Sequence, residues 1–495
     1  MTAPLVILAV TFAAAIALGL LARRGHTMDL EQWSVGGRGF GTIFVFLLMA
    51  GEIYTTFTFL GGSGWAYGKG GPALYILCYG AAAYTISYFL LPVVWRYARA
   101  NGLVSQADFF ASKYESPAFG ALVGLVSVVA LVPYLVLQLK GLGIIVSEAS
   151  YGRVSPTAAV WAGTAALVLY VVVSGVRGSA WTAAFKDILI LSVAVVIGVY
   201  LPVHYYGGYG AMFRAIDRAR PGFLTLPGAG MSPSWFISTV LLTAVGFYMW
   251  PQFFAGSYTA KHEDVFRKNA VILPLYQLII LFVFFAGFAA VLQVPGLKGA
   301  AGDLSLLRIS ERTFAPGWVG VIGAAGLLTA LVPGSMILVT AATILAQNVY
   351  RVAVPEATDR TVSLLARALV PVLALAAVGL TLRGGEAIVP LLLMGYNVVT
   401  QLFPALLLSL GERPLVTTMG AVMGIVAGEA TVAYLTLSGA SVATLAPWAP
   451  QAVKDLNVGI VALAVNCAAL AVVTAATARP AASSPTSTGS TSASR

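Results

Sequence analysis

Residues Gly51–Gly64 read GEIYTTFTFLGGSG and lie within an apolar stretch that runs from about residue 42 to residue 66. The stretch is long enough for a helix that crosses a bilayer. It nevertheless contains a carboxylate, a run of hydroxyl side chains and repeated glycines. Irregular backbone at membrane depth is tolerated only where it is buried in protein or lines a cavity. We therefore expect a helix that is interrupted near the middle of a membrane.

A second apolar stretch, near residues 234–256, has an interruption of the same kind. It contains Gly246–Gln252 (GFYMWPQ), followed by Gly256 and Ser257. Interruptions at corresponding places in two halves of a chain are typical of transporters whose binding site lies at the breaks. Gly and Pro are also common in ordinary membrane helices. The matching positions of the two breaks, rather than either break alone, therefore favour a binding site.

The composition places the whole chain in lipid. Of its 495 residues, 59% are hydrophobic and 9% are charged, whereas a soluble domain carries about 25% charged residues. Only helices and closed barrels satisfy their backbone groups in lipid. Barrel strands are short and alternate in polarity, but the apolar runs here are continuous and about 20 residues long. The sequence therefore predicts an all-α membrane protein.

We expect about 13 transmembrane helices, in a single domain from 1 to 477. The Ser- and Thr-rich residues 478–495 are expected to form a disordered cytoplasmic tail. The apolar stretches lie near 3–22, 42–66, 72–96, 119–148, 155–174, 178–202, 234–256, 270–294, 317–349, 361–382, 386–409, 415–437 and 455–477.

Basic residues predict the orientation. None precedes the first stretch, and Arg23 and Arg24 follow it directly, which is the reverse of a secretory signal. We expect the N-terminus outside and the C-terminus in the cytoplasm. Most of the 28 Lys and Arg residues, with Lys186 counted among them, then fall on the cytoplasmic side, although the arginines near 214–220 do not. The net charge is +10, but the basic residues lie singly between the apolar stretches and form no patch. No nucleic-acid partner is therefore expected.

Two smaller features carry local predictions. Val104–Tyr114 (VSQADFFASKY) has Ser105 at an N-cap position and predicts a short interfacial helix, with a solvated loop as the alternative. Cys78 and Cys467 lie inside apolar stretches without disulfide or metal spacing, and are expected to be buried thiols.

Ionisable and amide side chains inside the apolar stretches are candidate functional groups, because they are expensive to place in lipid. Glu52 is a candidate proton carrier or cation partner, with a structural hydrogen-bonding role as the alternative. Lys140 is expected to snorkel or to pair with Glu429 rather than to bind a substrate carboxylate. Asn397 lies four residues before Gln401, so both share a helix face. The two either line a pathway or join helices.

Motifs for catalysis are missing from the sequence. It contains no H-E-x-x-H, no P-loop and no G-x-S-x-G. The three histidines fall in loops without ligand spacing. We therefore expect no enzyme, no organic cofactor and no confident metal site.

Several local strings resemble the solute:sodium symporter family, most closely its bacterial monocarboxylate permease branch. In that branch an acid followed shortly by Tyr-Thr opens the second helix, and Leu-Val-Pro occurs in the ninth. The resemblance covers nearly the whole chain except the tail. The strings are Gly51–Gly64, Ala107–Tyr114 (ADFFASKY), Pro133–Gly141 (PYLVLQLKG), Ser174–Asp187 (SGVRGSAWTAAFKD) and Ala325–Arg351 (AGLLTALVPGSMILVTAATILAQNVYR).

The resemblance implies a LeuT-like bundle of two inverted five-helix repeats, with core repeats at about 42–202 and 234–409, broken helices 2 and 7, and a bacterial plasma-membrane location. It also implies a cation site made of carbonyl groups near Glu52, Thr55 and Thr329, with hydroxyl groups from the ninth helix. The positions of those hydroxyl groups are held here by Val332 and Pro333, which have no side-chain oxygen.

This departure leads us to expect proton coupling, with Glu52 as the leading carrier and Na⁺ as the alternative ion. Thr56 still matches a coordinating hydroxyl position, so a shifted cation site stays open. The candidate ion-coupling residues are Glu52, Thr55, Thr56 and Thr329.

The branch resemblance implies short carboxylates as substrates, such as lactate, pyruvate, acetate or propionate, and alanine as a further candidate. Half-helix N–H groups and hydroxyl groups at the breaks suit a carboxylate, and aromatic side chains suit a short apolar tail. The candidate substrate-binding residues are Tyr54, Thr55, Thr58, Tyr134, Gln138, Tyr248, Trp250 and Asn397.

Three other functions stay open. They are sodium-coupled symport of another small solute such as proline, pantothenate or urea, a membrane sensor, and a channel. The expected partners are a small-molecule monocarboxylate and the lipid bilayer, with no obligate protein partner.

Overall fold

The computed structural model describes residues 3–24, 33 and 38–478. Across these ranges the regular structure is helical, and an isolated parallel β-bridge joins Phe40 to Ala260. The first half comprises α1 (Ala3–Arg23), α3 (Thr42–Gly51), the π-helix η2 (Phe57–Gly61), α4 (Gly62–Lys69), η3 (Gly71–Leu74), α5 (Tyr75–Ala100), α6 (Gln106–Lys113), α7 (Pro117–Ala149), α8 (Pro156–Tyr206) and α9 (Tyr209–Ala219).

The second half begins with the other interrupted helix. It comprises α10 (Pro233–Gly246), η4 (Phe247–Met249), α11 (Pro251–Tyr258), α12 (Asp264–Gln277), α13 (Ile280–Gln293), η5 (Gly299–Leu304), α14 (Ser305–Thr313), α15 (Pro316–Ile344), η6 (Leu345–Tyr350), α16 (Arg351–Ala353), α17 (Asp359–Arg383), α18 (Ile388–Val399), η7 (Thr400–Leu402), α19 (Phe403–Leu407), α20 (Thr418–Ser438), α21 (Val442–Leu445), α22 (Gln451–Lys454) and α23 (Val458–Thr477).

Ten helical stretches of the described chain are long and apolar enough to cross a membrane, and the bent pair α10–α11 makes up to eleven. Thr42–Gly51 and Pro156–Val172 are shorter apolar helices. The chain is therefore a multi-pass integral membrane protein, and the count of thirteen spans stays a prediction. Two of the predicted spans, 155–174 and 178–202, lie in the single continuous helix α8.

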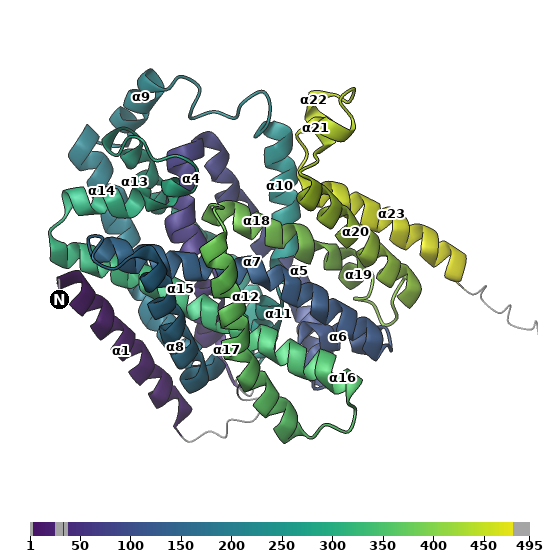
Figure 1. Ribbon diagram of the computed structural model, residues 1–495. Coiled ribbons are helices and arrows are strands. Elements are labelled where there is room, and N and C mark those ends of the chain that lie inside the picture. Colours follow the sequence, from purple (N-terminus) through teal and green to yellow (C-terminus); the bar gives the residue numbers. More distant parts are fainter. Residues whose placement is uncertain (1–2, 25–32, 34–37, 479–495) are drawn as a thin grey trace, which may run out of the picture.

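The helices form a bundle with α15 at its centre (Figure 1). In the most apolar part of Pro316–Ala353, which includes α15, 94% of the residues are buried, whereas 22% are buried in the corresponding parts of α1 and α23. α1 lies on one flank against α8 and α15, and α20 packs with α23 on the opposite flank. Because lipid covers these flanks, they expose apolar side chains that a soluble protein would bury.

The short helix predicted after Ser105 is confirmed as α6. The Ser105 hydroxyl accepts the Asp108 N–H at 3.0 Å, and Asp108 Oδ2 accepts the Ser105 N–H at 3.0 Å. This capping box satisfies free donors at the helix start. Phe109 and Phe110 are fully buried, so α6 packs inside the protein, mainly against α7.

The prediction that both cysteines are buried is wrong. Cys78 on α5 and Cys467 on α23 are both exposed. Each lies on the outward face of a helix, where an apolar thiol is compatible with lipid.

The two interrupted helices run in opposite directions. Phe40, just before α3, pairs with the residues just after α11. Its N–H donates to the Thr259 carbonyl at 3.0 Å, and its carbonyl accepts the Lys261 N–H at 2.9 Å. The start of one broken helix therefore lies beside the end of the other, as an inverted repeat requires. The predicted inverted-repeat bundle, with broken helices 2 and 7, is confirmed.

Candidate functional site

The first break separates α3 from η2. Glu52 follows the last residue of α3, and the helix resumes at Phe57 after a non-helical segment. The Thr58 hydroxyl accepts the Thr55 N–H at 2.9 Å and lies 2.9 Å from the Ile53 carbonyl oxygen. The Thr55 hydroxyl accepts the Phe57 N–H at 3.1 Å. These two hydroxyl groups satisfy backbone groups that the break leaves without helical partners.

A lysine satisfies two further carbonyl groups of the first break. Lys186 Nζ donates to the Gly51 carbonyl and, at 3.0 Å, to the Tyr54 carbonyl. It also forms an ion pair with Asp187 Oδ1 at 3.3 Å, and its side chain is completely buried. Both residues belong to α8. The ammonium group therefore joins the middle of α8 to the break in the first interrupted helix.

The prediction that Lys186 lies on the cytoplasmic side is wrong. The residue lies inside the predicted span 178–202 and is fully enclosed by protein. The signal that could have found it was the pair Lys186-Asp187 within an apolar run, because adjacent opposite charges in a membrane helix mark an internal site.

The second break has a different chemistry. α10 ends at Gly246 and is followed by η4. The backbone of Trp250 is extended, and Pro251 begins α11, which is bent by 47° relative to the helix before it. Proline suits the first position of a helix because it lacks an N–H group. Gln106 Nε2 donates to the Met249 carbonyl at 2.8 Å, and Ser127 donates to Gln106 Oε1 at 2.9 Å. Neutral amide and hydroxyl groups therefore hold this break, rather than charges.

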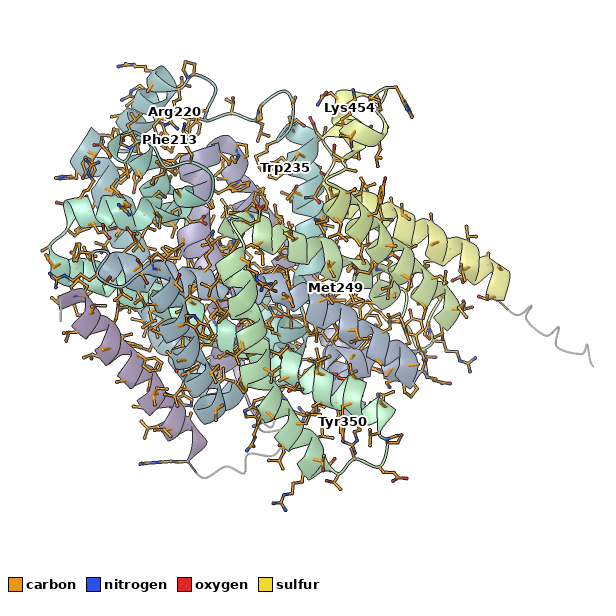
Figure 2. All side chains as sticks on the ribbon, in the orientation of Figure 1. Phe213, Arg220, Trp235, Met249, Tyr350 and Lys454 are labelled. Carbon is orange, nitrogen blue, oxygen red and sulfur yellow. The ribbon has the colours of Figure 1, made fainter. Side chains whose placement is uncertain are left out.

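Figure 2 shows Met249 between Arg220 and Lys454 at one end of the molecule and Tyr350 at the other. The second break thus lies in the interior of the bundle rather than at its ends. This position is the one expected for a binding site that opens alternately to the two sides.

A cavity lies between the two breaks. The free space at its centre is about 10 Å³, which is about what one water molecule needs. The site is therefore closed in this conformation, and a substrate requires its walls to move apart. The lining residues are Glu52, Ile53, Thr55, Phe57, Thr58, Tyr79, Gly80, Tyr84, Tyr134, Phe247, Trp250, Phe253, Gln277, Leu392 and Tyr396.

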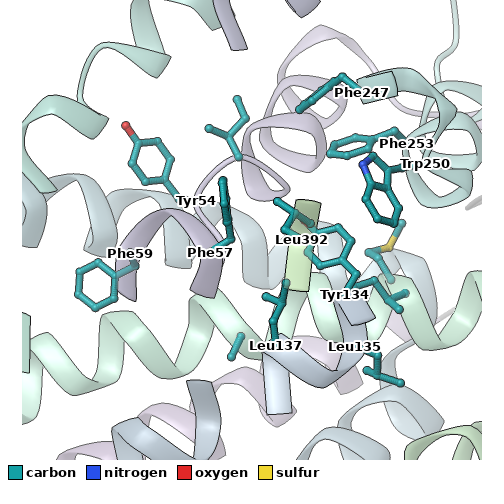
Figure 3. Close-up of a cluster of buried hydrophobic side chains, with 14 of the residues drawn as sticks. Tyr54, Phe57, Phe59, Tyr134, Leu135, Leu137, Phe247, Trp250, Phe253 and Leu392 are labelled. Atoms are coloured by element: carbon teal, nitrogen blue, oxygen red, sulfur yellow. The ribbon is translucent and has the colours of Figure 1, made fainter. Parts of the chain in front are cut away.

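Aromatic rings form much of the cavity wall (Figure 3). The Trp250 ring lies edge to face with Tyr134 at a centroid distance of 4.9 Å and with Tyr396 at 5.2 Å. Phe247 and Phe253 are 4.4 Å apart. A Cβ atom added to Gly395 would lie 2.4 Å from Trp250 Cη2. α18 therefore needs glycine at this position to let the indole pack against it.

The structure brings four of the predicted substrate-binding residues to the cavity, beside Glu52. They are Thr55, Thr58, Tyr134 and Trp250.

The other four predicted residues are not part of the cavity lining. The Tyr54 ring points away from Tyr134 and Trp250 (Figure 3), and its hydroxyl donates to the Tyr276 carbonyl at 3.0 Å. Gln138 lies next to Gly334 of α15, and Asn397 lies next to Gly459 of α23. The Tyr248 ring contacts the rings of Phe247 and Phe253.

Gln401, the helical neighbour of Asn397, joins helices. Its Nε2 donates to the Gly459 carbonyl at 3.2 Å, and Asn466 Nδ2 donates to its backbone carbonyl at 2.7 Å. Of the two roles considered for this pair, the contacts of Gln401 favour the joining of α18 and η7 to α23.

The predicted ion-coupling residues are distributed between the first break and α15. Glu52 is 5% exposed, and its carboxylate oxygens have no hydrogen-bond partner within the described chain. Thr56 packs against α7, where a Cβ atom on Gly141 would lie 2.0 Å from Thr56 Cγ2. The Thr329 hydroxyl donates to the Gly326 carbonyl of its own helix at 2.7 Å.

Several polar residues of the lining are not among the predicted site residues. Tyr79 and Tyr84 come from α5, Gln277 from α12 and Tyr396 from α18. Gln277 Nε2 donates to the Ile76 carbonyl at 3.3 Å. Gln277 could have been found as an amide inside an apolar stretch. Buried tyrosines are too frequent in this chain to stand out by residue type alone.

Lys140 has a different partner from the one expected. Its Nζ lies 3.6 Å from Asp303 Oδ2 and donates to the Glu386 carbonyl, so the predicted pair with Glu429 is wrong. Asp303 Oδ2 also accepts the Ile388 N–H at 3.0 Å and thereby caps α18. Burial raises the pKa of Asp303 to about 6, and Lys140 partly opposes that rise. The ion pair links α7, η5 and the start of α18.

Two antiparallel interrupted helices around a closed polar cavity define a secondary transporter that works by alternating access. The chain belongs to the sodium:solute symporter family, whose model matches residues 33–428. It is 62% identical to the uncharacterized symporter YhjB of Bacillus subtilis (strain 168), over 94% of this chain and 95% of that protein. It is 28% identical to a monocarboxylate transport permease protein of Rhizobium johnstonii, over 69% and 70% of the two chains.

Solved structures agree with this fold. A Na⁺-coupled sialic acid symporter in a substrate-bound outward-open state is similar, with a TM-score of 0.74, 16% identity and 96% coverage of both chains. The nucleobase-cation symporter Mhp1 is similar with a TM-score of 0.53 and 11% identity, over 90% of this chain and 95% of the other. At these identities the likeness shows the fold alone.

The family implies sodium, but the residues at the first break and at the corresponding positions of α15 do not fit it. Val332 and Pro333 offer no side-chain oxygen. The carbonyl groups of Gly51 and Tyr54 already accept from Lys186 Nζ. An ammonium group and a sodium ion cannot use the same carbonyl lone pairs without close repulsion between the two positive charges.

Proposed function

We propose that this protein is a proton-coupled symporter that imports short monocarboxylates across the plasma membrane of a bacterium. The observation that supports this function best is the closed cavity between the two breaks. It combines one carboxylate, one indole, several hydroxyl groups and an aromatic wall in a small space. The similarity to a monocarboxylate transport permease protein supports the same substrate class. The predicted orientation, with the N-terminus outside, is part of the proposal.

Two donors in the cavity suit a carboxylate substrate. Trp250 Nε1 and the Tyr84 hydroxyl are buried without a hydrogen-bond partner in the described parts of the chain. An unsatisfied buried donor costs about 1–3 kcal/mol. A carboxylate placed between the breaks relieves this cost, and the neighbouring rings cover a short apolar tail.

The charges around the first break favour a coupled proton. Lys186 is paired with Asp187 and acts electrostatically on Glu52. Two carboxylates thus share one ammonium, which leaves a net negative charge when both are ionised. A substrate carboxylate is repelled by an ionised Glu52 but accepts a hydrogen bond from a protonated one. Protonation of Glu52 and binding of the substrate therefore favour each other.

Uptake into proteoliposomes tests this function directly. The purified protein is given labelled pyruvate or lactate, and a pH gradient and a sodium gradient are imposed separately. We expect accumulation when the outside is more acidic than the inside, and none with sodium alone. Accumulation that follows the sodium gradient and ignores the pH gradient would contradict proton coupling.

A sodium-coupled carrier of another small solute is the second candidate, because the family favours it. Competition against labelled pyruvate by unlabelled proline, pantothenate, urea and short carboxylates separates the two. We expect only the short carboxylates to compete. Accumulation against a concentration gradient also excludes a channel.

A further inference from the structure

The first break contains a positive charge that is part of the chain. Lys186 Nζ lies against the Gly51 and Tyr54 carbonyl groups, which the loss of helical structure leaves free. A Cβ atom on Gly51 would lie 3.6 Å from Lys186 Nζ and 3.9 Å from Val332 Cγ1. The ammonium group therefore occupies the space between α3, α8 and α15. In discontinuous helices, unwound carbonyl groups at such a place coordinate the coupling cation.

The groups that face Lys186 form an enclosed set. Asp187 comes from α8 itself, Glu52 and Tyr54 come from the first break, and Tyr276 from α12 contacts Asp187. On the α15 side Val332 supplies only carbon atoms. The carboxylate of Asp187 and two carbonyl groups thus give the ammonium three oxygen partners, and Val332 adds none on the α15 side.

We propose that the Lys186 ammonium is a built-in cation that replaces sodium at the first break, and that transport is therefore independent of sodium. This inference rests on the proposed transport function and adds the nature of its cation site. A covalently attached cation keeps the break joined to α8 but cannot be released on the other side of the membrane. Sodium binding and release consequently have no part in the cycle.

A thermal-unfolding experiment tests the inference without any substrate. The midpoint is measured for the purified wild-type protein and for Lys186→Ala, in NaCl and in choline chloride at equal ionic strength. Lys186→Ala frees the two carbonyl groups and Asp187, so we expect sodium to raise its midpoint by several degrees, saturably. We expect no difference between the two salts for the wild type. Equal effects of sodium on both proteins, whether zero or not, overturn the inference.

Lys140→Ala is the matched control, because Lys140 also lies on a spanning helix and contacts an aspartate and a backbone carbonyl. We expect no sodium-specific shift in this variant. A shift equal to that of Lys186→Ala overturns the assignment to the first break.

A second measurement covers the case in which Lys186→Ala fails to fold. Uptake by the wild type is measured at a fixed pH gradient with sodium replaced by choline. We expect a change of less than twofold, and a loss of fivefold or more overturns the inference. Absence of uptake of any short carboxylate in both salts contradicts the proposed substrate instead. The unfolding midpoint of the wild type in the two salts then decides the cation question, because a sodium-specific rise of that midpoint overturns the inference.

Discussion

The two breaks have the same backbone feature but opposite chemistry. At the first break, an ammonium group donates to two backbone carbonyl groups and interacts with two carboxylates. At the second break, Gln106 and Ser127 supply neutral hydrogen bonds, and aromatic rings fill the space. The inverted repeat therefore provides two equivalent positions in the fold, and the side chains give each position its own role.

We propose, as part of the function given above, that ion coupling belongs to the first break and that the rings at the second break enclose the substrate. Buried charges are costly in a low-dielectric interior unless they are paired. A buried charged cluster is therefore expected where a change of charge, such as protonation, is part of the function. Rings that pack edge to face are rigid and apolar, which suits a wall that closes around a small molecule. The predictions below address this division, from the largest expected effect to the smallest.

Glu52→Gln tests the charged side most directly. We expect the variant to lose accumulation driven by a pH gradient, with initial uptake reduced by about tenfold or more, because the amide cannot release a proton. Exchange of labelled for unlabelled substrate should persist, since exchange needs no net proton transfer. Both are measured in proteoliposomes.

Glu429→Gln is the matched control for Glu52→Gln. Glu429 is also a carboxylate of a spanning helix, but it lines an apolar hollow between α7 and α20, away from both breaks. We expect it to keep gradient-driven uptake. Equal losses in both variants would show that the effect is not specific to the first break.

Trp250→Ala tests the enclosing side. Removing the indole takes away a free donor and the contacts with Tyr134 and Tyr396, so we expect the apparent KM for pyruvate to rise about tenfold, which corresponds to about 1.4 kcal/mol. The ion dependence should not change. The exposed Trp318 provides the control substitution Trp318→Ala, for which we expect an unchanged KM.

Gln106→Leu tests how the second break is held. The variant leaves the Met249 carbonyl without its donor, and we expect a loss of about 1–3 kcal/mol in stability, seen as a lower unfolding midpoint. Ser127→Ala removes only the donor to Gln106, so its effect should be smaller. The opposite order would indicate that Ser127 holds this region independently of Gln106.

The interrupted helices could be predicted from the sequence because their signals are local. Gly51–Gly64 and Gly246–Gln252 combine helix-breaking residues with polar side chains inside apolar stretches, and both breaks occur where the sequence predicts them. The N-cap at Ser105 could also be predicted, because the signal for a capping box lies within four consecutive residues.

The partners of the charged residues could not be predicted, because they depend on how distant helices approach. Lys140 pairs with Asp303 rather than Glu429, and Lys186 is enclosed rather than cytoplasmic. Spacing along one helix gives the face of a side chain but not the neighbouring helix. Tyr54 shows the same limit: it was a candidate by its position at the break, and its direction is set by Tyr276, 222 residues away.

Tyr54→Phe carries the smallest expected effect and separates position in the sequence from position in the cavity. Its hydroxyl donates to a backbone carbonyl outside the cavity lining, so we expect a stability loss of about 1 kcal/mol and less than a twofold change in the KM for pyruvate. Tyr134→Phe, at a tyrosine that does line the cavity, should raise KM more. If Tyr54→Phe instead has the larger effect on KM, the substrate contacts the other face of the first break, and the division between a coupling break and an enclosing break must be redrawn.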